Sequence, residues 1–273
     1  MRLGIFAKTF SGTEPATVLA AVQQAGYETT QFNLACAGLP SMPDAVPADA
    51  VAAIRAAVRS TGVSLAALSG TYNMAHPDKS VRDDGLRRLA VVIETAAVLD
   101  IPLVTLCTGS RNAADQWAFH PDNATQAAWT DMAAEMEKAL ALAEDAGVDL
   151  GIEPEQANIV TSARDAKRLI ADMRSKRLKI VLDPANLFEH ATPDEARAIV
   201  AAAIGEAAGH VAMAHAKDRH GDGRFATTGQ GIVDFPDFVA RLKAVGFDGA
   251  LVTHGLSADE APGVAAFLQG LLR

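Results

Sequence analysis

The chain has 273 residues, of which 49% are hydrophobic and 5% aromatic, and its formal net charge is −9. This length is typical of a single α/β barrel, and the apolar fraction is sufficient for a large buried core. The acidic net charge argues against a nucleic-acid partner, because phosphate backbones attract basic proteins.

The first ten residues predict a strand rather than a secretory signal, because they contain no apolar segment followed by a small-residue cleavage site. No stretch reaches the roughly 18 uninterrupted apolar residues of a membrane span. Cys36 and Cys107 are too few for a disulfide framework. We therefore expect a cytoplasmic protein with reduced cysteines and no membrane partner.

Eight short apolar runs follow one another along the chain. They are continuous rather than alternating, as in strands that are buried on both faces. Ala-, Leu- and Glu-rich stretches with helical patterning separate them, and several of these stretches end at a glycine. Eight such units without an evident linker predict one domain over residues 1–273, a single (β/α)8 TIM barrel; a doubly wound open sheet is the alternative. The predicted strands are 2–7, 29–34, 64–69, 102–107, 149–153, 179–183, 210–215 and 249–253.

The longest predicted loops all follow a strand, and they cover residues 35–48, 70–80, 108–125 and 216–234. Loops that precede a strand, such as the one around 146–148, are short. Active sites of (β/α)8 barrels lie at the carboxyl ends of the strands. The asymmetry in loop length therefore predicts a site at that end of the barrel.

Four residues that can bind a metal terminate the last four predicted strands: Glu153, Asp183, His215 and His254. Successive members are separated by about the length of one strand, one helix and two short loops, so the four side chains are expected to converge. Two carboxylates and two imidazoles suit a divalent cation such as Mn²⁺, Mg²⁺, Co²⁺ or Zn²⁺. The alternative is four separate rim residues that share no ion.

Five segments surround or follow these positions: GIEPE (151–155), VLDPAN (181–186), HAKD (215–218), GQGIVDF (229–235) and GFDGALVTHG (246–255). In these segments the chain resembles the xylose isomerase-like TIM barrels, a family that includes ketose 3-epimerases, hydroxypyruvate isomerase, inosose-processing enzymes and the endonuclease IV branch. The resemblance covers essentially the whole chain. It implies that Glu153, Asp183 and His215 are metal ligands, and we expect Mn²⁺ before the other divalent cations.

His254 departs from the family pattern, because the resemblance implies a glutamate at this position. In the ketose epimerases of the family, the glutamates of strands five and eight are the two acid/base groups. His254 could ligate the metal through a neutral nitrogen, or act as an acid or base with an ordinary pKa near ~6.5. We therefore expect a metal-dependent sugar isomerase or epimerase that works through an enediolate of a hydroxy-ketone or hydroxy-aldehyde. The missing glutamate favours chemistry with one base, Glu153.

Further candidates lie next to these residues or on the long loops. Lys217, two residues after His215, is predicted to orient a substrate oxygen, with an ion pair to Asp218 as the alternative. The predicted substrate-binding residues each have a plain alternative role as a solvated loop residue, a helix cap, a rim charge or a packing residue. They are Lys8, His76, Trp117, His120, Glu155 and Asn186.

Three other functions remain open from the sequence. A metal-dependent lyase or dehydratase acting on a keto-sugar or inosose would use the same residues. A non-catalytic barrel that binds a sugar or a metal would fit the loss of the strand-eight glutamate at His254. An endonuclease IV-like repair enzyme is the least favoured, because the resemblance implies a three-metal cluster of many His, Asp and Glu ligands there, and the chain has seven histidines with few on the first four strands. The net charge of −9 also opposes DNA binding. The expected partner is a small carbohydrate, and a homo-oligomer is left open.

Overall fold

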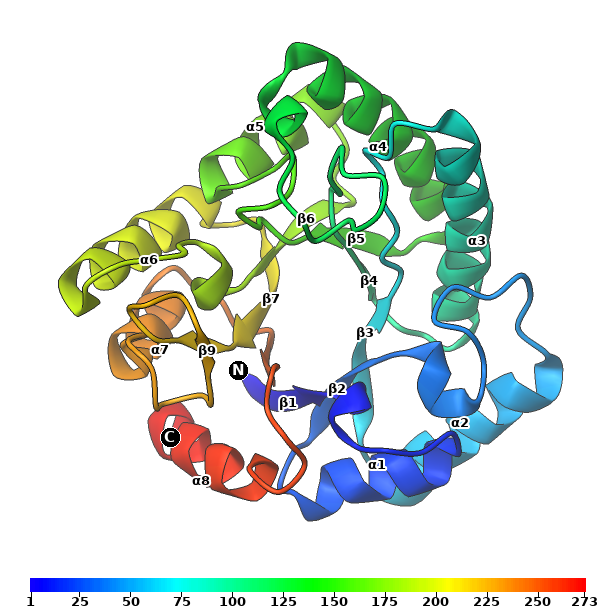
Figure 1. Cartoon of the computed structure of the whole chain (residues 1–273). Coiled ribbons are helices and arrows are strands. Elements are labelled where there is room, and N and C mark those ends of the chain that lie inside the picture. Colours follow the sequence, from blue (N-terminus) through cyan, green and yellow to red (C-terminus); the bar gives the residue numbers. More distant parts are fainter.

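Eight parallel strands form a closed barrel in the computed structural model, which describes residues 1–273 (Figure 1). The barrel closes because β1 pairs with β10 on one side, with Arg2 opposite Ala250, and with β2 on the other. The predicted (β/α)8 barrel is therefore confirmed, and the open-sheet alternative is wrong. In barrel order the strands are β1 (Arg2–Phe6), β10 (Ala250–Thr253), β7 (Val211–Ala216), β6 (Leu178–Leu182), β5 (Asp149–Ile152), β4 (Leu103–Leu106), β3 (Ser64–Ser69) and β2 (Thr29–Phe32).

Eight α-helices surround the strands as an outer ring (Figure 1). Their ends follow local signals in the sequence. Thr192 and Glu195 form a capping box, and Gly62 and Gly147 terminate helices with a φ of +73°. The helices are α1 (Pro15–Gln24), α2 (Ala48–Thr61), α3 (Lys79–Val98), α4 (Gln126–Ala146), α5 (Ala163–Met173), α6 (Pro193–Ala207), α7 (Phe235–Ala244) and α8 (Ala261–Leu272). None of them combines the length and the apolar character that crossing a membrane would need.

A small apolar cluster forms the floor of the site. Side chains two positions apart on a strand share a face. Val181, Met213 and Val252 of this cluster therefore lie beneath Asp183, His215 and His254, respectively. The larger cluster of 64 buried residues, which contains apolar side chains from all eight helices, forms the main core. The barrel interior is therefore apolar beneath the site and polar at the carboxyl ends of the strands.

Asp218 organises the loop between β7 and α7, which the sequence predicts as irregular. Its Oδ1 accepts hydrogen bonds from the backbone N–H groups of Arg219 and Val233, and its Oδ2 accepts them from those of Gly229 and Gly231. The carboxylate is completely buried. The loop contains a short antiparallel hairpin, β8 (Asp218–Arg219) and β9 (Phe225–Ala226). Both carboxylate oxygens of Asp218 therefore accept hydrogen bonds from the backbone, and Asp218 forms no ion pair with Lys217.

Replacing Asp218 with alanine is expected to lower the free energy of unfolding by roughly 3 kcal/mol or more, since an unpaired buried polar group costs about 1–3 kcal/mol. The measurement is urea unfolding followed by circular dichroism. Asp222→Ala is the control, because Asp222 is exposed in the same loop and pairs only with Arg224. Equal midpoints for the two variants would contradict the role given to Asp218.

Candidate metal centre

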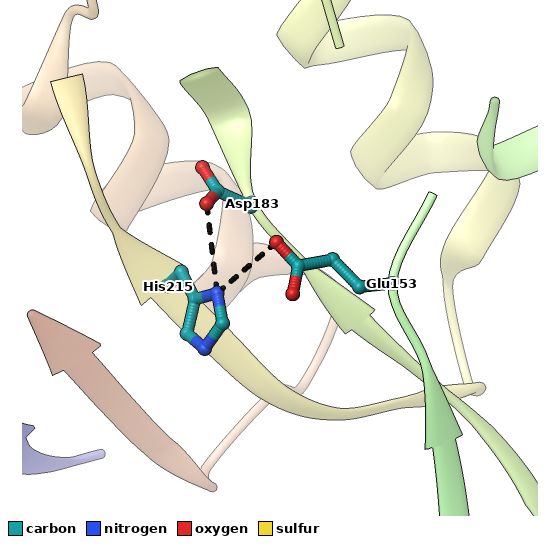
Figure 2. A group of neighbouring side chains, drawn as sticks. All are labelled: Glu153, Asp183 and His215. Atoms are coloured by element: carbon teal, nitrogen blue, oxygen red, sulfur yellow. Dashed lines mark ion pairs between the residues drawn. The ribbon is translucent and has the colours of Figure 1, made fainter. Parts of the chain in front are cut away.

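Three side chains from adjacent strands converge at the carboxyl end of the barrel (Figure 2). His215 Nδ1 lies 3.4 Å from Glu153 Oε1 and 3.5 Å from Asp183 Oδ2. One candidate ligand atom from each residue lies within 4.8 Å of the other two. The three residues therefore present two carboxylate oxygens and one imidazole nitrogen to a single point.

Proline helps to place both carboxylates, because it cannot donate the backbone hydrogen bond that would continue a strand. Pro154 follows Glu153, and Pro184 follows Asp183. Glu153 and Asp183 are therefore the first residues after β5 and β6. Asp183 Oδ1 also accepts a hydrogen bond of 2.9 Å from the N–H of Ala185, which caps the short helix η4 (Pro184–Asn186).

The buried atoms of the cluster fit a bound cation. Asp183 and His215 are 1% and 2% exposed, and neither Asp183 Oδ2 nor His215 Nδ1 has a hydrogen-bond partner. The two atoms meet only as an ion pair at 3.5 Å, and a buried polar atom without a hydrogen bond costs about 1–3 kcal/mol. A divalent cation between the carboxylates and the imidazole would satisfy both atoms, and oxygen and nitrogen ligands of this kind are ordinary for one. The Glu153, Asp183 and His215 cluster could therefore hold a metal ion.

Opposite charges shift the proton affinities within the cluster. Burial alone lowers the pKa of His215, but the negative charges of Glu153 and Asp183 outweigh it and raise that pKa to about 10. Burial alone raises the pKa of Asp183, but the positive charges of Lys217 and His215 outweigh it and hold that pKa well below its ordinary range. Without a metal, the ring of His215 is therefore protonated on both nitrogens and positively charged at neutral pH.

Metal affinity is expected to rise with pH, because a cation must displace that proton from His215. The ordinary pKa of histidine is about 6.5, and that of His215 is raised to about 10. At pH values below the raised pKa of His215, apparent affinity should increase by up to about tenfold per pH unit. Zinc titrations from about pH 6 to about pH 8 test this expectation, and calorimetry in two buffers counts the released protons. An affinity independent of pH would contradict it.

His254, the fourth predicted ligand, lies beside the cluster and is not one of its three members. Its ring stacks between Phe6, with centroids 5.0 Å apart, and His215, with centroids 5.4 Å apart. Its Nδ1 is buried without a hydrogen-bond partner. Burial, and then the positive charges of His215 and Lys217, lower the pKa of His254 to about 4. The structure thus places a neutral imidazole next to the cluster.

Lys217 and Asn186 support Glu153 through two hydrogen bonds. The ammonium of Lys217 donates to Asn186 Oδ1 at 3.0 Å, and Asn186 Nδ2 donates to Glu153 Oε1 at 2.7 Å. Because lysine only donates, the amide oxygen of Asn186 faces Lys217 and its NH₂ faces Glu153.

Glu155 is half-buried nearby, and burial, followed by the charge of Glu153, raises the pKa of Glu155 to about 7.

A cavity of about 300 Å³ opens beside the cluster. Five predicted site residues line it, namely Lys8, Trp117, Glu153, His215 and His254. The sequence reasoning missed the polar residues on the wall formed by β2, β3, β4 and their loops. A signal existed in and directly after β2, where Thr29, Gln31 and Asn33 are polar and lie two positions apart, so that their side chains share a face. The missed polar residues are Gln31, Asn33, Ser41, Ser69, Thr71, Thr105 and Gln116.

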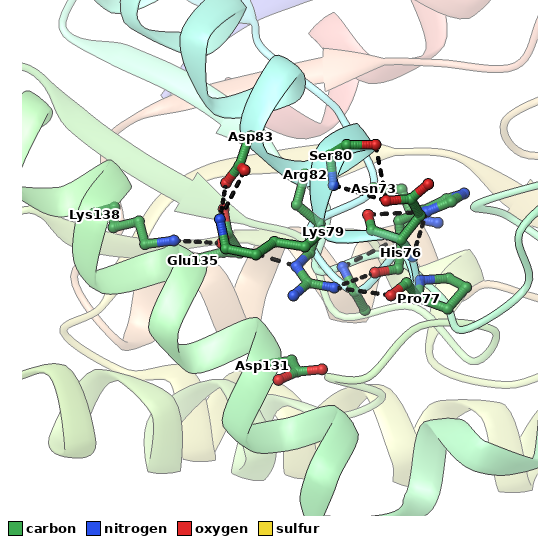
Figure 3. Close-up of polar contacts among 12 residues, drawn as sticks. Asn73, His76, Pro77, Lys79, Ser80, Arg82, Asp83, Asp131, Glu135 and Lys138 are labelled. Atoms are coloured by element: carbon green, nitrogen blue, oxygen red, sulfur yellow. Dashed lines mark hydrogen bonds and ion pairs between the residues drawn. The ribbon is translucent and has the colours of Figure 1, made fainter.

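Two predicted histidines lie outside this cavity and hold rim loops. The ring of His76 accepts a hydrogen bond of 3.0 Å from the N–H of Asp78, and its other nitrogen lies 3.2 Å from the carbonyl oxygen of Ala113. His120 accepts one of 3.2 Å from the N–H of Asp122. Figure 3 shows His76, which precedes α3, beside a polar network between α3 and α4. In this network the buried Arg82 of α3 donates a hydrogen bond to the carbonyl oxygen of His76 and forms an ion pair at 3.8 Å with Glu135 of α4.

Several solved structures share this fold over nearly the whole chain. A 3-keto-D-glucoside 4-epimerase, YcjR, from E. coli is 16% identical with a TM-score of 0.78, and 99% of each chain is covered. An L-ribulose 3-epimerase is 20% identical with a TM-score of 0.79, and 99% of this chain and 94% of that chain are covered. A D-psicose 3-epimerase from Clostridium cellulolyticum H10 is 16% identical with a TM-score of 0.76, and both chains are fully covered.

Sequence comparisons give a second, independent result. A search of curated protein sequences found no match to the chain. The family model described as xylose isomerase-like TIM barrel matches residues 19–271. That range includes Glu153, Asp183 and His215 of the candidate metal centre. The chain belongs to the xylose isomerase-like TIM barrel family.

Proposed function

We propose that this protein is a divalent-metal-dependent sugar isomerase or epimerase that acts on a hydroxy-ketone or hydroxy-aldehyde. The observation that carries the proposal is the Glu153, Asp183 and His215 cluster, which has unpaired buried atoms and borders a cavity of about 300 Å³. Its polar walls and size suit one small carbohydrate. The sugar epimerases among the structures of similar fold support the same reaction class.

Glu153 is the proposed base. Its side chain is 19% exposed and lines the cavity, so a substrate carbon can approach it. Oε1 accepts the hydrogen bond from Asn186, which leaves Oε2 as the oxygen with no protein hydrogen bond. In this proposal Glu153 removes the proton from the hydroxyl-bearing carbon next to the carbonyl, which gives an enediolate. After this proton exchanges with solvent, Glu153 delivers a proton to the former carbonyl carbon, and the hydroxyl proton passes from one substrate oxygen to the other. Lys217 acts through Asn186 as a positioning residue.

Glu153, Asp183 and His215 would hold the cation, with Mn²⁺ as the first expectation and Mg²⁺, Co²⁺ or Zn²⁺ as alternatives. A divalent cation supplies Lewis acidity that stabilises negative charge on substrate oxygens. The protein residues around it bind and orient the substrate. Lys8, which lines the cavity, would bind a substrate oxygen, and the half-exposed ring of Trp117 would pack against the sugar.

Glu153 is the only carboxylate on the cavity wall, and His254 occupies the strand-eight position. A wall with one carboxylate favours a reaction in which a single base carries the proton, over one in which two carboxylates act on opposite faces. His254 would then bind a substrate hydroxyl. One base next to an imidazole also fits β-elimination, so a lyase or dehydratase acting on a keto-sugar is the second candidate.

Incubation with Mn²⁺ and a panel of keto-sugars in D₂O tests the proposal, with proton NMR and mass spectrometry as the readouts. An isomerase or epimerase should place deuterium on carbon in a product of unchanged formula, whereas a lyase should release a dehydrated product. Protein treated with a chelator is the control. The absence of both deuterium on carbon and dehydration with metal-loaded protein would contradict the proposal and favour a non-catalytic barrel.

A further inference from the structure

Gln31 on β2 contacts the opposite side of the His215 ring from the metal centre. Its Oε1 lies 2.8 Å from His215 Nε2, and the two residues are 184 positions apart in the chain. The Gln31 side chain is 6% exposed. Its Nε2 lies 3.2 Å from both Ser69 Oγ on β3 and Thr105 Oγ1 on β4. A buried hydrogen-bonded chain therefore runs across three strands and ends on the imidazole.

Hydrogen-bond satisfaction selects one orientation of the Gln31 amide. With Oε1 toward His215, the two amide hydrogens have one hydroxyl each, and every polar group of Gln31 is paired. In the flipped orientation the NH₂ group would face His215 and the amide oxygen would face both hydroxyls. One buried amide hydrogen would then lack a partner, which costs about 1–3 kcal/mol.

This orientation determines which nitrogen of His215 faces the carboxylates. The amide oxygen only accepts, so His215 Nε2 carries the hydrogen and donates it to Gln31. Nδ1 is then the nitrogen that points toward Glu153 and Asp183, at 3.4 and 3.5 Å. A histidine ligand needs its ring orientation and tautomer held in this way, and partners of metal-ligating histidines commonly do so.

We propose that Gln31 is a positioning residue of the metal centre, which holds His215 with Nε2–H toward β2 so that Nδ1 is presented to the cation. The inference rests on the proposed metal-dependent function and assigns a role to the polar wall opposite the carboxylates. Ser69 and Thr105 extend that role, because they hold the amide of Gln31 in place.

Zinc binding and histidine NMR of three variants test this proposal. Gln31→Leu removes the acceptor at similar size. Gln31→Glu keeps an acceptor oxygen toward His215, and its second oxygen can accept from the hydroxyls of Ser69 and Thr105. Gln156→Leu is the matched control, because Gln156 lies outside the cavity wall and donates to the backbone carbonyls of Thr161 and Leu187.

We expect Gln31→Leu to weaken zinc binding by about 10–100-fold, the usual effect of losing such a partner. The ¹⁵N-histidine spectrum of this variant should also lose the hydrogen-bonded Nε2–H signal of His215. Gln31→Glu should restore both zinc binding and the signal, and Gln156→Leu should behave as the wild type. If Gln31→Leu does not fold, the double variant Ser69→Ala with Thr105→Val removes both anchors of the amide and should weaken zinc binding.

Unchanged zinc affinity together with an unchanged Nε2–H signal in Gln31→Leu would overturn the positioning role and leave the proposed function standing. Failure of the wild-type protein to bind Zn²⁺ or Mn²⁺ would overturn the proposed function. In that case the His215 spectra of metal-free wild type and Gln31→Leu still decide whether Gln31 holds the ring.

Discussion

Glu153→Gln is expected to lower the rate of deuterium incorporation into a keto-sugar by at least about 10²–10⁴-fold, the contribution typical of a positioned base. The amide has nearly the shape of the carboxylate but cannot accept the proton. Its oxygen can still accept the hydrogen bond from Asn186, so the local structure should persist. Asp183 and His215 remain as ligands, and some metal binding should therefore survive.

The measurement combines the NMR exchange rate with the metal content of the same preparation. Glu189→Gln is the matched control, because Glu189 is an exposed glutamate that does not line the cavity. If Glu153→Gln keeps its metal but loses deuterium exchange, the loss results from the missing base and not from a missing metal ligand. Exchange at the wild-type rate in Glu153→Gln would show that another group is the base.

Asp183→Asn is expected to weaken metal binding by more than ~100-fold. That value is the upper end of the loss seen when a residue that contacts a metal ligand, but not the metal itself, is replaced. Asp183 is 1% exposed, and its Oδ2 faces His215 Nδ1 without a hydrogen bond. The substitution removes a negative charge that neither solvent nor a neighbouring group can replace there. Oδ1 can still cap η4 through Ala185, so the fold should be retained.

Zinc titration with a competing chelator measures this effect, and circular dichroism verifies folding. Asp222→Asn changes an exposed carboxylate on the same end of the barrel and should bind zinc as the wild type does. Wild-type zinc affinity in Asp183→Asn would mean that any bound ion lies elsewhere, and the metal-dependent reading of the site would then be wrong.

The ends of the strands near the site were predictable from local features of the sequence. Glu153 and Asp183 each follow a short apolar run and precede a proline, which ends the strand whatever surrounds it. His254 shows where such reasoning stops. Its position at the end of β10 was predicted, but its ring lies in a stack with Phe6 and His215 instead of joining the three-residue cluster. The direction of a side chain depends on the neighbours that surround it.

Local sequence patterns were sufficient to predict the barrel, its eight strands and the end of the barrel that carries Glu153, Asp183 and His215. Periodicity, helix-terminating glycines and loop length are local properties, so these conclusions required no knowledge of the packing. Which atoms of the site contact one another depends on how the strands are arranged in space. Gln31 and His215 become partners because closure of the sheet sets β2 and β7 across one barrel, and no local pattern encodes a contact over 184 residues.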